Sequence, residues 1–283
     1  MTDGAEAPPG PPSRPRIIAI ANQKGGVGKT TTAVNLATAL AAVGRRVLVV
    51  DADPQGNAST ALGIGRDQRR VTTYDLIIDQ RPAAEALVET KIPGLALIPA
   101  SVDLSGAEIE LIDLDRREAR LRDALARLPD RFDYVMIDCP PSLGLVTLNA
   151  LVAARGVLVP LQCEFLALEG LSHLVRTIER VRAHLNPELS MQGIVLTMFD
   201  KRNNLSMQVA DDVRGYFGEV VYQTMIPRNV RVSEAPSHGM PVLLYDLQCP
   251  GSQAYVRLAS EVLRREEKPQ QRAAGPARKE EPA

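Results

Sequence analysis

A glycine-rich segment holds the residues of this sequence that are best suited to phosphate chemistry. Residues 22–32 read NQKGGVGKTTT and follow a short apolar run. Glycines let backbone N–H groups turn toward phosphate oxygens, and the positive end of a following helix adds to the attraction. Lys29 would neutralise the β- and γ-phosphates of a nucleotide, and the Thr30 hydroxyl would hold Mg²⁺. The segment therefore predicts a phosphate-binding loop.

The loop departs from the usual pattern at two positions. Gln23 stands where the usual loop has its first glycine, and a second lysine, Lys24, precedes the glycines. The alternative interpretation is a glycine-rich turn with incidental lysines. The preceding strand pattern, the following helix pattern and the Lys-Thr ending all agree with a phosphate loop instead.

Carboxylates follow two other apolar runs. Asp51 and Asp53 come after residues 47–50, and Asp138 comes after residues 134–137. Ligands of parallel sheets bind at the carboxyl ends of the strands, so these acids are expected beside the loop. Asp138 is predicted to support Mg²⁺ indirectly, behind Thr30. The alternative for each acid is a cap of a helix or turn.

The elements that must position these residues alternate along the chain. Apolar runs without polar alternation predict buried parallel strands, and longer periodic segments predict the helices between them. The predicted strands are residues 17–21, 47–50, 95–98, 134–137, 156–159 and 193–197, with a further short strand near 220–224. The predicted helices are residues 30–43, 107–128, 143–153, 169–184, 205–217 and 252–265. This order predicts an α/β fold with a single doubly wound, mostly parallel sheet flanked by helices, as in P-loop NTPases.

Composition and chain length bound the organisation. The 283 residues are 45% hydrophobic and have a net charge of -1, so nucleic-acid binding would require a local basic patch. Residues 16–265 are predicted to form one domain. The Pro-rich residues 1–15 and the charged residues 266–283 are predicted to be disordered. No apolar run reaches the ~18 residues that a membrane span needs.

Four motifs, in this order, resemble those of the ParA/Soj chromosome-partitioning ATPases, a group with a deviant Walker A loop. They are KGGVGKTTT, DADPQGNAST, IDCPPS and IPRNVRVSEAPSHGMPV, and the resemblance covers about residues 16–265. The septum-site regulator MinD, the nitrogenase iron protein and bacterial tyrosine kinases share the first motif only or in part.

The resemblance implies a role for individual residues. Lys24 matches the signature lysine that crosses an ATP-bound dimer, and Gly25 matches a residue packed at that interface. Asp53 matches the acid that positions or activates the attacking water, and Asp138 matches the Walker B acid. Lys24, Lys29 and Asp53 are thus the expected catalytic residues. The expected nucleotide-binding residues are Lys24, Gly25, Gly26, Val27, Gly28, Lys29, Thr30, Thr31, Pro227 and Asn229.

The resemblance also implies an activity and partners. It implies slow ATP hydrolysis with ATP/ADP and Mg²⁺, a homodimer in the ATP state, non-specific binding to double-stranded DNA and stimulation by a ParB-type centromere-binding protein. The cargo would be a chromosome or plasmid, and the expected location is cytoplasmic and nucleoid-associated. Arg202, Arg228 and Arg231 lie in segments expected to bind DNA. The alternative is that the arginines of this region are surface charges paired with acids such as Asp200 and Glu234.

Two other functions compete with partitioning. A MinD-like membrane-cycling ATPase would need an amphipathic C-terminal helix, but the tail EEKPQQRAAGPARKEEPA has almost no large apolar residue. No membrane partner is therefore expected. A P-loop kinase or ligase would need an acceptor pocket for a small substrate, and the sequence identifies none.

Overall fold

A seven-stranded sheet forms the centre of the protein, which we describe from a computed structural model covering residues 14–129, 131–165 and 167–273. The strand order is β3-β4-β2-β5-β1-β6-β7, and every pairing is parallel except that of β3 with β4. The strands are β1 Arg16–Ile20, β2 Val47–Asp51, β3 Val88–Glu89, β4 Leu95–Ile98, β5 Tyr134–Asp138, β6 Gly156–Gln162 and β7 Ser190–Thr197. The predicted α/β fold with a mostly parallel sheet is confirmed.

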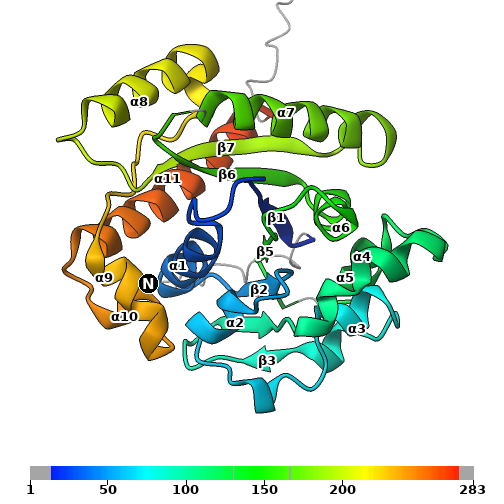
Figure 1. Cartoon of the computed structure of the whole chain (residues 1–283). Coiled ribbons are helices and arrows are strands. Elements are labelled where there is room, and N and C mark those ends of the chain that lie inside the picture. Colours follow the sequence, from blue (N-terminus) through cyan, green and yellow to red (C-terminus); the bar gives the residue numbers. More distant parts are fainter. Residues whose placement is uncertain (1–13, 130, 166, 274–283) are drawn as a thin grey trace, which may run out of the picture.

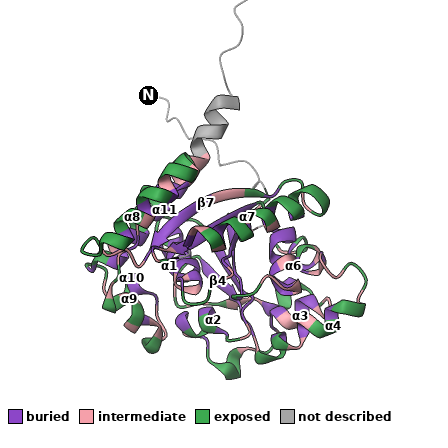
Figure 2. Ribbon diagram, turned by 45° about the horizontal axis from the view of Figure 1, so that its top comes forward, coloured by how far each residue is buried: buried purple, intermediate pink, exposed green. Residues whose placement is uncertain are grey.

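Each strand supplies side chains to two separate cores. In β1, Ile18 and Ile20 face one core while Ala19 faces the other, because successive side chains of a strand point to opposite faces. Both faces of the sheet are covered by helices, with α1 and α11 on one side and α5 and α6 on the other (Figure 1). The strands are accordingly buried, and the exposed residues lie on the outer surfaces of the helices (Figure 2).

The helices follow the predicted order with several additions. In the described residues the α-helices are α1 Lys29–Ala42, α2 Asn57–Ala61, α3 Thr73–Ile77, α4 Ala107–Glu110, α5 Arg120–Leu125, α6 Leu145–Ala153, α7 Ala167–His184, α8 Asn204–Phe217, α9 Val230–Glu234, α10 Val242–Tyr245 and α11 Pro250–Ala273. None of these helices is both long and apolar enough to span a bilayer.

The long helix predicted over residues 107–128 is wrong. The segment forms α4, a short 3-10 turn and α5, separated by non-helical backbone. Leu114 is extended, with φ -90 and ψ 140, and Arg116 has a positive φ of 53. Both conformations interrupt an α-helix, so the periodic apolar residues reach the core from two short pieces.

Two predicted boundaries also differ. The short strand expected near residues 220–224 is reduced to an isolated bridge between Val221 and Ile194. Helix α11 continues past residue 265 to Ala273, so helical backbone extends into the tail that was predicted to be disordered. Glu266 is fixed there by an ion pair with Arg16 at 2.8 Å. Residues 1–13 and 274–283, which hold the rest of the predicted tails, lie outside the described residues.

Candidate nucleotide site

The glycine-rich loop connects β1 to α1 at the carboxyl end of the central strands. Gly26 and Gly28 adopt φ values of 75 and 89, which glycine reaches without a steric penalty. Gly28 is also the N-cap of α1, and its carbonyl accepts the Thr32 N–H at 2.9 Å. The loop therefore ends at a helix N-terminus, the backbone arrangement that binds phosphates.

Hydrogen bonds to β6 and β7 and within the loop itself fix the shape of the loop. The Asn22 side-chain amide donates to the Pro160 carbonyl at 2.8 Å, and its oxygen accepts from the Lys24 N–H at 3.0 Å. The Thr197 hydroxyl donates to the Val27 carbonyl at 2.8 Å. Sequence reasoning did not identify Asn22 or Thr197. Their only signal is a polar residue at the carboxyl end of an apolar strand.

The two lysines of the loop have different environments. Lys29 is buried, and its Nζ donates to the Lys24 carbonyl at 3.0 Å. Burial lowers the pKa of Lys29, although the charges of Asp138 and Asp53 oppose that shift. Lys24 is half-exposed and forms an ion pair with Glu164, just after β6. Only Lys29 thus points its charge into the site of its own chain.

Asp138 is a fully buried carboxylate that lies close to Thr30 and Lys29. Both of its oxygens are buried without a hydrogen-bond partner among the described residues. Burial and the neighbouring Asp51 raise its pKa well above the ordinary value, while Thr30 and Lys29 favour its charged form. An unsatisfied buried carboxylate beside a hydroxyl is the oxygen set that Mg²⁺ with its waters prefers. Thr30 and Asp138 therefore fit the predicted metal site.

Asp51 and Asp53 divide into a structural and a free carboxylate. Asp51 is fully buried and accepts the Ser59 N–H at 2.8 Å, the Ser59 hydroxyl at 2.7 Å and the Asp53 N–H at 3.3 Å. Burial raises the pKa of Asp51 to about 6. Asp53 accepts one hydrogen bond, from the Gln55 N–H to Oδ1 at 3.0 Å, which leaves Oδ2 free of partners within the described chain. Asp53 is thus the better placed of the two to contact a ligand.

The C-terminal part of the chain adds a cavity beside the loop. It has a volume of about 210 Å³, and its lining includes Gly28, Thr31, Pro227 and Asn229. Asn229 is fixed there because its side chain accepts the Val232 N–H at 3.3 Å and caps α9. The structure thus brings Pro227 and Asn229, which lie far along the sequence, next to the phosphate loop.

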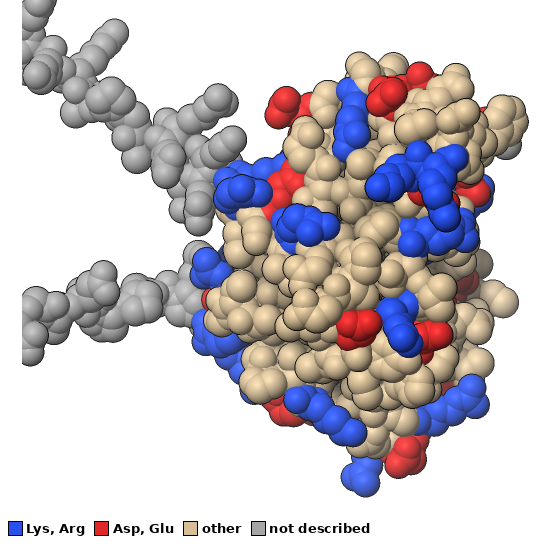
Figure 3. Space-filling view, turned by 90° about the vertical axis from the view of Figure 1, so that its left-hand side faces the viewer, with Lys and Arg blue, Asp and Glu red and all other residues tan. Residues whose placement is uncertain are grey.

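The arginines predicted to bind DNA lie outside this site and differ in their partners. Arg202 makes two hydrogen bonds to the Asp200 carboxylate, at 3.0 and 2.9 Å. Arg231 pairs with Glu234 at 3.1 Å and with Asp246 at 3.6 Å. Arg202 and Arg231 therefore agree with the alternative interpretation, in which these arginines are surface charges paired with acids. Arg228 has no carboxylate partner among the described side chains. On the face that carries α8 to α11, basic surface is more extensive than acidic surface (Figure 3).

Comparison with known proteins gives consistent matches. The family model of an AAA domain matches residues 15–191. The chromosome partitioning protein ParA of Caulobacter vibrioides is 65% identical over 261 residues, which is 92% of this chain and 98% of that protein. The sporulation initiation inhibitor protein Soj of Bacillus subtilis is 52% identical and covers 87% of this chain and 98% of its own.

A solved structure is also similar over most of the chain. It is described as cobyrinic acid a,c-diamide synthase of Mycobacterium smegmatis with a bound ATP analog and magnesium. Its TM-score is 0.79, with 41% identity over 90% of this chain and 97% of that one. The loop, the acids beside it and the full-length similarity to ParA and Soj agree, and the chain belongs to the ParA/Soj family of chromosome-partitioning ATPases.

Proposed function

We propose that this chain is an ATP-driven DNA-partitioning switch that works as a dimer. The observation that carries the proposal is the difference between its two loop lysines. Lys29 is buried beside Asp138 and Asp53, where it serves the nucleotide of its own chain. Lys24 is half-exposed and is turned toward Glu164, away from that position. A lysine so placed is available to the nucleotide of a second subunit.

Within one subunit, each group has a distinct task. The N–H groups of residues 25–31 and the Lys29 ammonium bind the phosphates, and Pro227 and Asn229 border the adenine. Mg²⁺, held by Thr30 with Asp138 behind it, would neutralise charge on the β- and γ-phosphates. Asp53 orients the attacking water through its free oxygen. Lys24 from the partner subunit adds positive charge at the γ-phosphate, as an arginine finger does.

The space around Gly25 is a second argument for the dimer. A Cβ at Gly25 would meet Pro141 at 3.9 Å, an ordinary contact, and Gly25 has no positive φ. Nothing in a single chain therefore requires glycine at this position. We infer that the requirement comes from close approach of the second subunit, whose loop packs against this one when both nucleotides are buried.

The dimer would bind double-stranded DNA without sequence preference. The sequence-based candidates for contacts with DNA phosphates are Arg202, Arg228 and Arg231. On binding, Arg202 and Arg231 would leave their carboxylate partners and contact phosphates instead. Exposed ion pairs are worth about 0–1 kcal/mol, so that exchange costs little. A ParB-type protein bound at centromere-like sites would stimulate slow hydrolysis and release the dimer. The proposed location is the nucleoid of the cytoplasm, and the cargo is a chromosome or plasmid.

The test measures ATP turnover of the purified protein alone, with random duplex DNA, and with DNA plus a ParB-type centromere-binding protein from the same organism. We expect slow basal turnover, ATP-dependent DNA binding and a rise in turnover when both additions are present. Turnover that ignores DNA and the ParB-type protein would contradict the proposal.

A second candidate function is ATP-dependent amide formation on a small substrate. It is favoured by the description of the Mycobacterium smegmatis structure as a cobyrinic acid a,c-diamide synthase. The cavities beside the loop have volumes of about 210 and 250 Å³. Both lie below the roughly 300–1,000 Å³ of pockets for drug-sized ligands, and a cobyrinic acid macrocycle is larger still. Formation of amide product from cobyrinic acid, glutamine and ATP would select this alternative.

A further inference from the structure

Helix α11 carries two exposed arginines without acidic partners. Arg257 and Arg264 lie on its outer surface, and neither forms an ion pair among the described side chains. They differ in this respect from Arg202 and Arg231, whose guanidinium groups are already held by carboxylates. An unpaired cation keeps its full attraction for an incoming phosphate, because no ion pair must first be broken.

The two arginines also border a wide hollow in the surface. Its volume is about 1130 Å³, and its lining includes Gln223, Thr224, Arg257, Ser260 and Arg264. These side chains present guanidinium, amide and hydroxyl groups, which are the usual donors to nucleic-acid phosphates. Lys and Arg side chains also cover more of the face shown in Figure 3 than Asp and Glu side chains do.

The acids that line the same hollow do not cancel this charge. Glu261 is buried and accepts the Gln223 N–H at 2.8 Å and the Thr224 N–H at 2.9 Å. It also pairs with Arg265 at 2.9 Å, so both belong to the framework of the hollow. Glu219 is the remaining acid of the lining, and it faces two unpaired arginines.

The spacing of the two arginines suits a nucleic-acid backbone. They are seven residues apart, so they lie on the same side of the helix, about 10 Å apart along its axis. Measured along the axis of a duplex, where each step of one strand rises about 3.4 Å, that distance spans about three phosphates. Ser260 lies between them on the same exposed surface, and its hydroxyl donates to the Val256 carbonyl at 3.1 Å. The row runs along one helix, so the spacing of its backbone positions is set before any ligand arrives.

We propose that Arg257 and Arg264 of α11 form a phosphate-binding row for duplex DNA. The row extends the DNA surface beyond the arginines of the loops and does not depend on breaking ion pairs. This inference rests on the proposed DNA binding. Pro227 lines both the hollow and the nucleotide cavity, so the row borders the part of the molecule that contacts ATP.

The experiment measures binding of the full chain, with ATP and Mg²⁺, to a random duplex over a series of salt concentrations. The double variant Arg257→Ala/Arg264→Ala should bind at least tenfold more weakly at moderate salt. The slope of log affinity against log salt should become shallower by about 2 per bound protomer, since each phosphate contact contributes about 0.9. Basal ATP hydrolysis should not change. The conservative variant Arg257→Lys/Arg264→Lys should retain most of the binding, because it keeps the charges.

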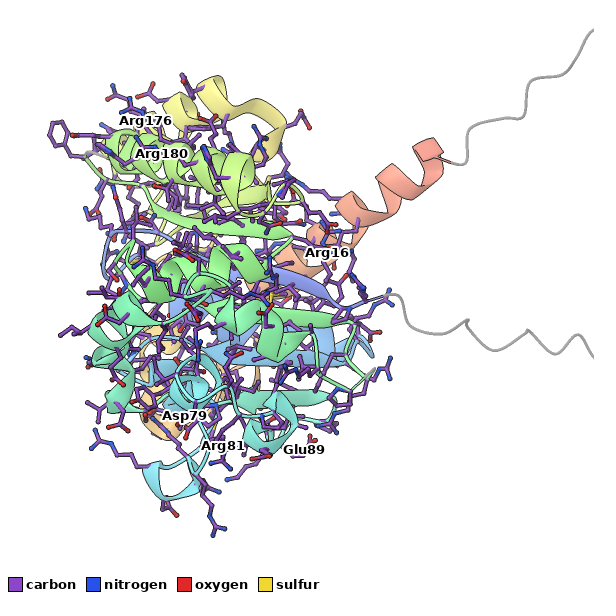
Figure 4. The ribbon with its side chains drawn as sticks, turned by 90° about the vertical axis from the view of Figure 1, so that its right-hand side faces the viewer. Arg16, Asp79, Arg81, Glu89, Arg176 and Arg180 are labelled. Carbon is purple, nitrogen blue, oxygen red and sulfur yellow. The ribbon has the colours of Figure 1, made fainter. Side chains whose placement is uncertain are left out.

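The matched control is Arg176→Ala/Arg180→Ala on α7. These arginines are also exposed and unpaired among the described side chains, but they lie on the opposite side of the molecule (Figure 4). The control should bind DNA as the wild type does. Equal binding by the α11 alanine variant and the wild type would overturn the inference and leave the proposed function standing. A wild-type protein that does not bind DNA with ATP would overturn both.

Discussion

Three neighbouring aspartates show how partners, more than position, decide what a carboxylate can do. Asp51 and Asp138 are paired in register on β2 and β5, and Asp53 follows two residues after Asp51. Ser59 donates two hydrogen bonds to Asp51. Among the described residues, the Asp138 oxygens have no hydrogen-bond partner and Asp53 keeps one free oxygen. The sequence placed all three at the carboxyl end of the sheet. It could not separate them, because Ser59 carries no sequence signal for its contact with Asp51.

Replacing Asp53 with Ala should separate hydrolysis from binding. We expect ATP affinity and ATP-dependent DNA binding to remain, and kcat to fall by about 100-fold or more, since a positioned base or acid contributes at least that much. Phosphate release and nucleotide titration measure the two properties. Asp79→Ala, an exposed acid labelled in Figure 4, is the control and should keep wild-type turnover. Unchanged steady-state hydrolysis in Asp53→Ala would rule out its role in positioning water.

The buried Asp51 should make stability depend on pH. Its pKa rises from 3.8 to about 6 in the folded chain, so its contribution is present at low pH and lost as the pH rises through 6. A shift of about two units corresponds to about 3 kcal/mol. The Asp51→Asn variant keeps an acceptor for Ser59 and removes the charge. Its free energy of unfolding relative to wild type should therefore increase between pH 4 and 7 in urea titrations. A difference that is independent of pH would contradict this assignment.

At the scale of elements, periodicity identified the strands and long helices but missed the breaks between short helices. Six apolar runs became strands because each is buried on both faces. The segment 107–128 has helical spacing too, yet Arg116 with its positive φ divides it. Strand β3 has only two residues and lies at the edge of the sheet, where it pairs with β4. A run of two residues is too short to show an apolar or alternating pattern in the sequence. The local sequence cannot specify such breaks, because they depend on packing between α4, α5 and α6.

Helix α6 offers a direct test of one such packing contact. Its N-terminus is capped by Glu108 from α4, which accepts the Leu145 N–H at 2.6 Å and the Val146 N–H at 3.3 Å. Removing a cap costs about 1 kcal/mol, so Glu108→Ala should lower Tm by about 2–4 °C in calorimetry. Glu179→Ala, an exposed acid on α7, is the control and should leave Tm within about 1 °C of wild type. Equal Tm values for the two variants would show that the cap is not stabilising.

At the scale of the whole molecule, the site is half of a structure shared between two chains in the proposed dimer. The sequence could predict this only through the resemblance, because no pattern within one chain reports a second one. The structure adds physical support in the outward-facing Lys24 and the sterically free Gly25.

Lysine substitutions test the dimer. Lys29→Ala should lose nucleotide affinity, because it removes the cation that faces the phosphates of its own chain. Lys24→Ala should still bind ATP but should remain a monomer and hydrolyse it poorly. Sedimentation with a non-hydrolysable ATP analogue, alongside nucleotide titration, measures both. An ATP-dependent dimer of Lys24→Ala that forms at wild-type concentrations would contradict the shared site.

Helix α11 also determines when, during synthesis of the chain, the helix that follows the phosphate loop can be fully packed. The loop is made first, but α1 behind it packs against α11, where Leu36 and Leu40 share a core with Leu258. The buried hydroxyls of Thr32 and Tyr255 lie 3.4 Å apart. A nascent chain therefore carries its nucleotide loop on a helix whose α11-facing apolar surface remains uncovered until α11 has been synthesised. Nucleotide binding should consequently appear only after α11 has been synthesised and has packed against α1.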